Sequence, residues 1–169
     1  MKNTLLAIIL FVFFTPPAKG DTSVHVSPFQ CEMSASTNQQ LNHGVILNFT
    51  ITNITDHSLK LLTWYTPLEG FLSKLFIIKN EIDETLNYNG MMVKRSTPTN
   101  EDYLVLATKE KVKITLNLTQ AYSFIAGEYT VQLSPKNWQY IQDKTLLTTQ
   151  CLANKLKIKV TSHDTKYFP

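Results

Sequence analysis

Histidine is the residue type that would most readily build a metal centre or an acid–base pair in this chain. Its four copies, His25, His43, His57 and His163, fall in four separate segments. A zinc site normally takes two ligands from one short motif, such as His-Glu-x-x-His on a helix. Because the sequence has no such motif, we expect each histidine to be a surface residue, and we expect no metal or other cofactor.

Nucleophilic and acid–base catalysis has equally little support. The sequence has no Gly-x-Ser-x-Gly elbow, and its five glycines form no phosphate-binding loop. The acidic residues that stand close together lie in polar segments, where carboxylates normally stay ionised and solvated. They are Glu81, Asp83 and Glu84, followed by Glu101 and Asp102. We therefore predict that the chain is not an enzyme.

Residues 1–20 have the pattern of a secretory signal peptide. Residues 5–14 are uninterruptedly apolar, and Ala18-Lys19-Gly20 offers small residues at a cleavage site. The alternative is an uncleaved anchor helix, but spanning a bilayer takes roughly 20 apolar residues, and Pro16-Pro17 would break such a helix. We expect residues 21–169 to form a single exported domain, secreted or periplasmic, with no membrane contact after cleavage.

The charge and the cysteines of the exported part limit the classes of partner and the redox compartment that we expect for it. Removal of Lys2 and Lys19 lowers the formal net charge from +3 to +1, which gives no reason to expect a nucleic-acid partner. The spacing of Cys31 and Cys151 fits neither a Cys-x-x-Cys redox motif nor a zinc cluster. In an oxidising compartment an even pair normally closes. We predict a Cys31–Cys151 disulfide that contributes on the order of a few kcal/mol.

Alternation of apolar and polar residues is the dominant pattern along the chain. In residues 45–52, for example, Val45, Leu47, Phe49 and Ile51 alternate with Asn and Thr side chains after residue 46. The same period of two predicts strands at residues 111–119, 129–133 and 155–160. Four further strand candidates cover residues 24–34, 59–65, 75–79 and 103–107.

These features predict an all-β protein, an immunoglobulin-like antiparallel β-sandwich of about seven or eight strands. Residues 143–153 are the one candidate for a short helix. The Cys-Trp-Cys spacing of antibody domains is not met, so the expected likeness is one of architecture. Because the sequence has no internal repeat or linker, we expect residues 21–169 to be one β-sandwich domain.

Three Asn-x-Thr sequons begin at Asn48, Asn53 and Asn117. Such sequons accept N-linked glycans in secreted proteins of some organisms. Asn48 and Asn117 fall on the predicted polar faces of strands, which is compatible with attached glycans. The alternative, which we favour, is that Asn and Thr are simply the residues of a solvated strand face.

The stretch LLTWYTPLEGFLSKLF, residues 61–76, places large apolar side chains where a polar loop would be expected. Such a loop either folds back to cap one end of the sandwich or presents its aromatic side chains to a partner. The second reading has a physical basis, because large rigid side chains concentrate interface energy. The residues that would contact a partner are Trp64, Tyr65, Pro67, Leu68, Glu69 and Phe71.

A longer series of motifs runs through residues 45–133, in WYTPLEGFLSKLFIIK and YNGMMVKRSTPTNEDYLVLATKEKVKITLNLTQAYSFIAGEYTVQL. In order, these blocks contain Trp64, Thr66-Pro67, Glu69-Gly70, Leu75-Phe76, Tyr88, Gly90, Lys94-Arg95, Pro98, Asp102-Tyr103, Leu116, Leu118, Tyr122, Gly127, Tyr129 and Val131. The series resembles the N-terminal pro-domain of the aspzincin zinc peptidases, the group of deuterolysin and peptidyl-Lys metalloendopeptidase. The sequence departs from the family at Asn117-Leu118, where Asp-Leu is usual, and at Tyr122-Ser123, where Tyr-Asp is usual.

The resemblance implies a β-sandwich that assists folding of a peptidase and blocks its active-site cleft. In the family, a catalytic domain with His-Glu-x-x-His and Gly-Thr-x-x-His-Asp motifs follows the pro-domain, and this sequence has neither motif. We therefore predict a non-catalytic protein that binds an aspzincin-type metallopeptidase from another chain, as an inhibitor or a chaperone. It would act sterically, by filling the cleft with its aromatic loop. The sequence gives no indication of oligomeric state.

The polar stretch with Lys94, Arg95 and Pro98 is expected to be a rigid structural loop, held at its far end by Asp102 and Tyr103. We expect Tyr103 to anchor in the core. We expect Asp102 to accept main-chain N–H groups or to pair with Arg95.

Two other functions fit the sequence. One is an exported binding or adhesion module with no remaining peptidase connection, for which affinity for host surface proteins or glycans would be expected. The other is a peptidase whose catalytic half was lost, which a zinc-binding motif encoded downstream of Pro169 would reveal.

Overall fold

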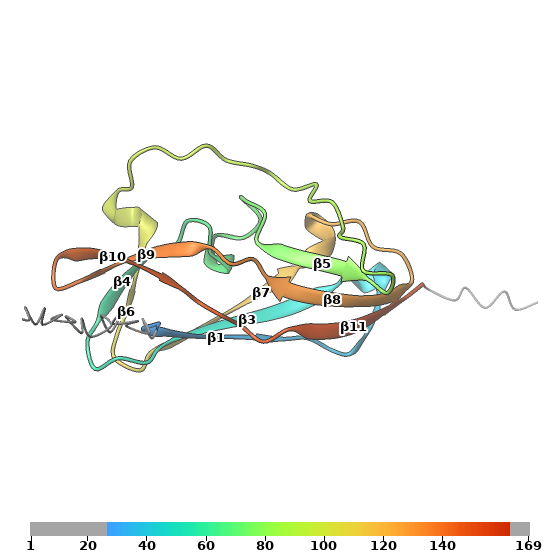
Figure 1. Ribbon diagram of the computed structural model, residues 1–169, viewed down its shortest axis with the longest axis horizontal. Helices are drawn as coiled ribbons and strands as arrows, with labels where there is room; N and C mark the ends of the chain where they lie inside the picture. Colours follow the sequence, from blue (N-terminus) through green and yellow to red (C-terminus); the bar gives the residue numbers. More distant parts are fainter. Residues whose placement is uncertain (1–26, 163–169) are drawn as a thin grey trace, which may run out of the picture.

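The computed structural model describes residues 27–162, which form a β-sandwich of eleven strands and four short 3-10 helices (Figure 1). The predicted signal peptide, the first residues of the strand expected at 24–34, His25 and His163 lie outside the described residues. The strands are β1 (Phe29–Ser34), β2 (Asn38–Gln40), β3 (Ile46–Asn53), β4 (Leu59–Leu62), β5 (Phe76–Asn80), β6 (Tyr103–Leu106), β7 (Lys111–Asn117), β8 (Gly127–Leu133), β9 (Asn137–Gln142), β10 (Thr145–Gln150) and β11 (Leu156–Thr161). The 3-10 helices are η1 (Leu41–His43), η2 (Pro67–Glu69), η3 (Asn100–Asp102) and η4 (Leu118–Gln120).

The three-stranded sheet β1-β3-β7 forms one layer of the sandwich. In its central strand β3, half-exposed positions alternate with buried ones, and Phe49 lies between Met33 of β1 and Ile114 of β7 in the register. Successive side chains of a strand point to opposite faces of the sheet. The period of two in the sequence therefore gives β3 its apolar face.

Two four-stranded sheets, β10-β9-β4-β6 and β2-β11-β8-β5, make up the rest of the sandwich. The chain passes between these two sheets at two breaks. β8 leads into β9 after residues 134–136, which include Pro135, and β10 leads into β11 after residues 151–155. All strand pairs are antiparallel except the short β2–β11 pair. The prediction of an all-β antiparallel sandwich is confirmed, and the strands beyond the seven or eight expected are β2, β9 and β10.

Aromatic contacts join the layers in the core. Phe29 of β1 meets Tyr140 of β9 edge to face, with ring centroids 5.5 Å apart, and Phe49 of β3 meets Trp138 of β9 at 6.3 Å. Edge-to-face pairs of this kind add to the stabilisation from buried area. These two contacts pack β9 against the inward faces of β1 and β3.

The short helix expected at residues 143–153 is wrong. β9 and β10 form a hairpin instead, and its two connecting residues, Asp143 and Lys144, have φ values of 48° and 64°. Positive φ at both positions is the mark of a type I′ turn, which suits the twist of a two-residue hairpin. β9 itself was not predicted, although Trp138 and Tyr140 alternate there with more polar neighbours.

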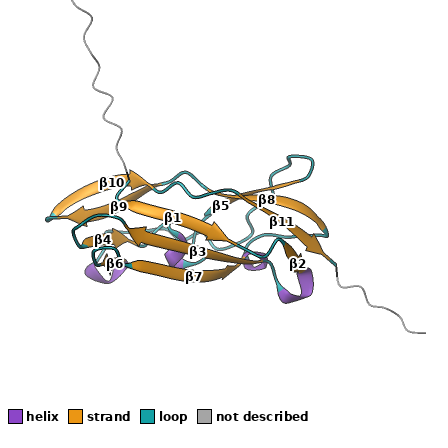
Figure 2. Ribbon diagram, turned by 90° about the horizontal axis from the view of Figure 1, so that it is seen from below, coloured by secondary structure: helices purple, strands orange, loops and turns teal. Residues whose placement is uncertain are grey.

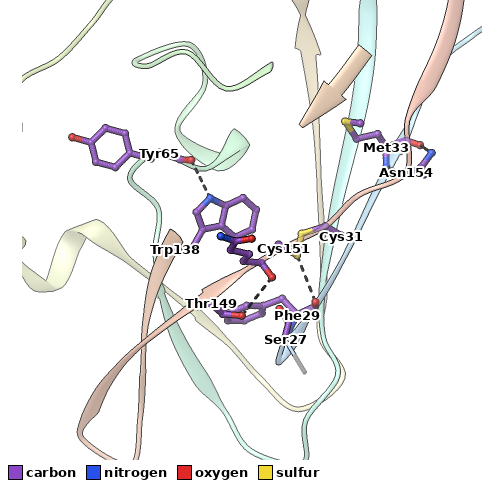
Figure 3. The surroundings of a disulfide bond; sticks show 10 residues. Ser27, Phe29, Cys31, Met33, Tyr65, Trp138, Thr149, Cys151 and Asn154 are labelled. Carbon is purple, nitrogen blue, oxygen red and sulfur yellow. Dashed lines mark hydrogen bonds between the residues drawn. A yellow bond between two sulfur atoms is a disulfide. The ribbon is translucent and has the colours of Figure 1, made fainter. Parts of the chain in front are cut away.

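The predicted disulfide is confirmed. Cys31 of β1 is bonded to Cys151, which follows β10, and both residues are buried. Figure 3 shows this bond and, near it, Asn154, whose side chain accepts from the Met33 N–H at 2.8 Å and donates to the Met33 carbonyl at 2.9 Å. The first strand is thus fastened to the stretch of chain that leads into β11.

The sequon at Asn53 lies in the interior. Asn53 is the last residue of β3, is fully buried, and its amide nitrogen donates to the carbonyls of His57, Leu106 and Ala107 at 2.7, 3.1 and 3.0 Å. A glycan would have to be attached to this same nitrogen. The folded protein is therefore incompatible with glycosylation at Asn53, contrary to the pattern of its sequon.

The other two sequons lie on half-exposed strand positions. The Asn48 side-chain oxygen accepts from the Thr115 hydroxyl at 2.8 Å, and the Asn117 side-chain oxygen accepts from the Thr119 hydroxyl at 2.7 Å. Neither amide nitrogen is buried among carbonyls as that of Asn53 is. Glycosylation at these two positions stays a prediction.

Candidate functional site

The loop formed by residues 64–71, called here the 64–71 loop, leaves β4 in a compact turn bonded to itself. The Thr66 hydroxyl donates to the Thr63 carbonyl at 2.6 Å and accepts from the Leu68 N–H at 3.2 Å, which caps η2. Gly70 ends the turn with a φ of 74°, a conformation that favours glycine. The path of the loop is therefore fixed largely by local hydrogen bonds.

Asp102 connects this loop to the polar segment at residues 87–99. Its carboxylate accepts the Trp64 indole N–H at 2.9 Å and the Thr99 main-chain N–H at 2.8 Å, and its carbonyl accepts the Thr63 N–H at 2.9 Å. The bond from the Thr99 N–H is the main reason that the pKa of Asp102 lies below its ordinary value. Asp102 thus stays a charged acceptor and receives main-chain N–H groups, one of the two roles expected for it.

Arg95 pairs with Glu69, and not with Asp102, the partner considered from the sequence. Its guanidinium forms an ion pair with the Glu69 carboxylate and lies over the Trp64 ring, 5.0 Å from the centroid. The other Glu69 carboxylate oxygen accepts the Tyr65 N–H at 2.8 Å. The side chains of Glu69 and Arg95 are only 6% and 17% exposed, so this largely desolvated pair, with its cation–π contact, fastens the polar segment to the loop.

Burial dominates the titration of Glu69. It raises the pKa of the carboxyl above its ordinary value, although the Tyr65 N–H and the Arg95 charge both act in the opposite direction. A carboxyl whose pKa is raised on folding stabilises the fold fully below its unfolded pKa, near 4.5. That contribution is lost as the pH rises through the folded-state pKa.

The substitution Glu69→Gln should therefore remove one pH-dependent contribution to stability. Gln keeps an oxygen for the Tyr65 N–H but does not titrate. The difference in free energy of unfolding between wild type and variant should therefore shrink as the pH rises above about 4.5, the ordinary carboxyl pKa. Urea unfolding of both proteins between about pH 4 and 7 measures this difference. The exposed Glu101→Gln is the control, and a wild-type advantage that grows with pH would contradict the assignment.

Most of the 64–71 loop folds back onto the sandwich. Of the residues expected to contact a partner, Pro67 is buried, and Trp64, Leu68, Glu69 and Phe71 are half-buried. The Phe71 ring lies against Phe76 and Tyr122, with centroids 6.4 and 6.5 Å away. Burial raises the pKa of Tyr122 to about 12, so its hydroxyl stays protonated and donates to the Phe76 carbonyl at 2.8 Å.

Tyr65 is the most exposed residue of this loop, with 39% of its surface accessible to solvent. Its carbonyl accepts the Trp138 indole N–H at 3.1 Å, and Figure 3 shows the Tyr65 ring directed away from that bond. Its φ of 61° lies in the left-handed region, which is costly for a bulky residue. The fold therefore holds the Tyr65 main chain in place while its ring points outward.

The segment at residues 87–99 crosses the outside of the sandwich without forming a strand, as the long yellow-green trace in Figure 1 shows. The Val93 N–H donates to the Leu72 carbonyl at 3.1 Å, and the Tyr88 hydroxyl lies 2.8 Å from the Met91 carbonyl. Met91, Met92 and Val93, called here the Met patch, are 65%, 75% and 39% exposed. The patch was not predicted, although two adjacent methionines in a polar segment were a signal for it.

The remaining residues of the expected structural loop have varied surroundings. Lys94 is exposed and Pro98 is half-buried. Tyr103 opens β6 and is also half-buried, so it does not anchor in the core as expected. The segment is held by Arg95, Asp102 and the main-chain bond at Val93.

The described residues hold no arrangement of metal ligands. Among residues 27–162, no group of three His, Cys, Asp or Glu side chains lies close enough to bind a metal ion. His43 and His57 are both exposed. In the same range, none of the helices has the length and apolar character needed to cross a membrane.

Comparison with known proteins finds similarity to an extracellular protease. No family model matches the chain. An extracellular protease of Aeromonas hydrophila is 26% identical over 89 residues, which make up 52% of this chain and 25% of the protease. The chain therefore spans about a quarter of the length of this relative.

Solved structures that match this chain in the comparison include the CARDB domain of the PF1109 protein from Pyrococcus furiosus. It has a TM-score of 0.40 and 12% identity, with 80% of this chain and 94% of that chain covered. A beta-glucosidase from Listeria innocua has a TM-score of 0.37 and 12% identity, with 88% of this chain and 20% of that chain covered.

Proposed function

We propose that this protein is an exported, non-catalytic β-sandwich that binds an aspzincin-type metallopeptidase and covers its active-site cleft. The observation that carries the proposal is the match to a quarter of an extracellular protease. A match confined to part of a protease supports a module that accompanies a peptidase. The motifs between Trp64 and Val131, which resemble aspzincin pro-domains, favour the same partner.

The contact surface in this proposal consists of Tyr65 and the Met patch. Val93 lies two residues before Arg95, and Tyr65 directly follows Trp64, so both exposed groups flank the Arg95–Trp64 contact along the chain. Tyr supplies a large rigid contact area, and Met adapts its shape to an irregular groove. The Asp102 and Glu69 hydrogen bonds order this surface before binding, which lowers the entropic cost of association.

The mechanism is steric occupancy of the cleft, with no covalent step. Inhibition should therefore be competitive with substrate, because protein and substrate occupy the same space. The same contact surface could assist folding of the peptidase, since any ligand that binds only the native state stabilises it.

The substitution Met92→Asp tests the surface. A charge at the centre of the Met patch should weaken inhibition of an aspzincin-type peptidase by about tenfold to a hundredfold, the range expected for a hot-spot residue. The control is Ile125→Asp, because Ile125 is also 75% exposed but lies in the loop before β8. Cleavage of a peptide substrate at several protein concentrations gives the inhibition constants.

A second assay separates inhibition from assistance in folding. Denatured peptidase is diluted into buffer with or without the protein, and the recovered activity is measured after the protein has been removed. Increased recovery supports the chaperone role. If the protein neither binds the peptidase nor changes its rate or its recovery at micromolar concentration, the proposed function is wrong.

A further inference from the structure

Strand β10 is the outer edge of the sheet β10-β9-β4-β6, and its sequence TLLTTQ contains no charge, proline or glycine. In Figure 2 it lies along the border of the molecule, with no described strand beyond it. Strands of this kind present unpaired N–H and C=O groups to other chains. β10 is therefore a candidate for pairing between molecules.

The hairpin geometry shows which main-chain groups of β10 are free. Gln142 and Thr145 flank the two-residue turn and form its hydrogen-bonded pair, and such pairs alternate along an antiparallel ladder. The N–H and C=O groups of Leu146, Thr148 and Gln150 consequently point away from β9. Within residues 27–162, the N–H groups of these three residues form no main-chain hydrogen bond outside the sheets.

The other edges among the described strands are protected. β2 and β6 have only three and four residues. β7 carries Lys111 and Lys113, and the outer edge of β5 is bonded to residues 84–86, for instance through the Leu86 N–H and the Ile78 carbonyl at 2.8 Å. β1 is covered by the disulfide and by Asn154. Lysines, short strands and covering segments are the usual protection against edge pairing, and β10 has none of them.

We infer that β10 pairs antiparallel with β10 of a second copy of this chain, about a twofold axis at Thr148. In this register Thr148 lies opposite the partner's Thr148, and Leu146 lies opposite the partner's Gln150. The outward groups of both strands then exchange about six main-chain hydrogen bonds. The two sheets join into one continuous sheet across the axis.

Charge and apolar exposure favour a second copy as the occupant. The turn residues Asp143 and Lys144 lie opposite the partner's Ala153 and the partner's Leu152, so no like charges meet. Leu146 and Leu152 are 56% and 77% exposed at the two ends of β10, and the pairing brings a side chain of the other copy beside each. The Lys144 stem can cover the partner's Leu152 while its ammonium group stays in water.

The test is the substitution Thr148→Lys, which places two like charges directly opposite each other across the axis. Sedimentation equilibrium of the wild-type protein from about 1 µM to 1 mM should show a monomer–dimer equilibrium, and the variant should dimerise at least about tenfold more weakly. The control Ala126→Lys adds the same charge in an exposed loop before β8 and should dimerise like wild type.

Hydrogen exchange locates the interface in the same samples. The amides of Leu146, Thr148 and Gln150 should exchange more slowly as the wild-type concentration rises. A wild-type protein that stays monomeric to about 1 mM would overturn the inference. It would be overturned even if β10 were then found to pair with a strand of another protein. Equal dimerisation of Thr148→Lys and Ala126→Lys would overturn it too. The inference does not depend on the peptidase partner.

Discussion

Replacing Cys31 and Cys151 together with alanine is expected to lower the free energy of unfolding by about 4–5 kcal/mol, the largest effect of any substitution proposed for this fold. The two cysteines are 120 residues apart in the sequence. Opening so long a loop restores much conformational freedom to the unfolded chain, and the chain-entropy model scales the loss of stability with loop length. Both residues are also buried, so the alanine side chains leave a small defect in the core.

Urea unfolding of the oxidised wild type, the reduced wild type and the double variant measures this effect. Each single variant, Cys31→Ala or Cys151→Ala, loses the same bond and should be destabilised nearly as much as the double variant. Reduced wild type should fall close to the same value. A double variant less than about 2 kcal/mol below the oxidised wild type, the lower end of typical disulfide contributions, would contradict this prediction.

Strands with one buried face were predictable from the sequence, because their apolar period is uninterrupted. β3, β7, β8 and β11 are of this kind, and each was expected close to its observed position. The β9–β10 hairpin was missed for two physical reasons. Leu146 and Leu147 are adjacent, which disturbs the period of two, and the turn residues Asp143 and Lys144 adopt positive φ without the glycine that usually signals such a turn.

The residues of the site and some of their local hydrogen bonds were predictable from the sequence. The contacts between residues far apart in the sequence were not. Asp102 was expected to accept main-chain N–H groups, a local arrangement that its position near Thr99 favours. The pairing of Arg95 with Glu69 joins residues 26 positions apart, and it depends on the path of the 64–71 loop. That path includes the left-handed conformation of Tyr65, for which the sequence offers no signal because such a conformation is unusual for an aromatic residue.

Asn53 shows how one strand position can decide between two readings of the same residue. Its sequon is a pattern typical of a surface residue. It has, however, the same parity along β3 as Leu47, Phe49 and Ile51, and the structure buries all four on one face. The period of two was therefore the better guide to its environment than the sequon.

The substitution Asn53→Asp is accordingly expected to destabilise the protein by about 3 kcal/mol or more at pH 7, as for other buried polar groups left without a matching partner. The Asn53 amide nitrogen donates to three carbonyls, and its oxygen accepts the Thr55 N–H at 3.0 Å and the Thr55 hydroxyl at 2.8 Å. A carboxylate would keep the bonds to Thr55 but would set a charged oxygen against the three carbonyl oxygens. Thermal and urea unfolding measure the loss.

The pH dependence of this variant gives a sharper test than the size of the loss. Protonation converts one carboxyl oxygen into a donor for those carbonyls, so burial should raise the pKa of the new group in the folded state. Its penalty should then shrink as the pH falls through that raised pKa, because the neutral form fits the site better. The control is Asn48→Asp, the same chemical change on the half-exposed face of β3, for which we expect a loss below about 1 kcal/mol, as is usual away from buried polar networks. Equal losses of stability in the two variants, with the same dependence on pH, would contradict this prediction. The end of β3 would then be held to β6 by something other than the buried hydrogen bonds of Asn53.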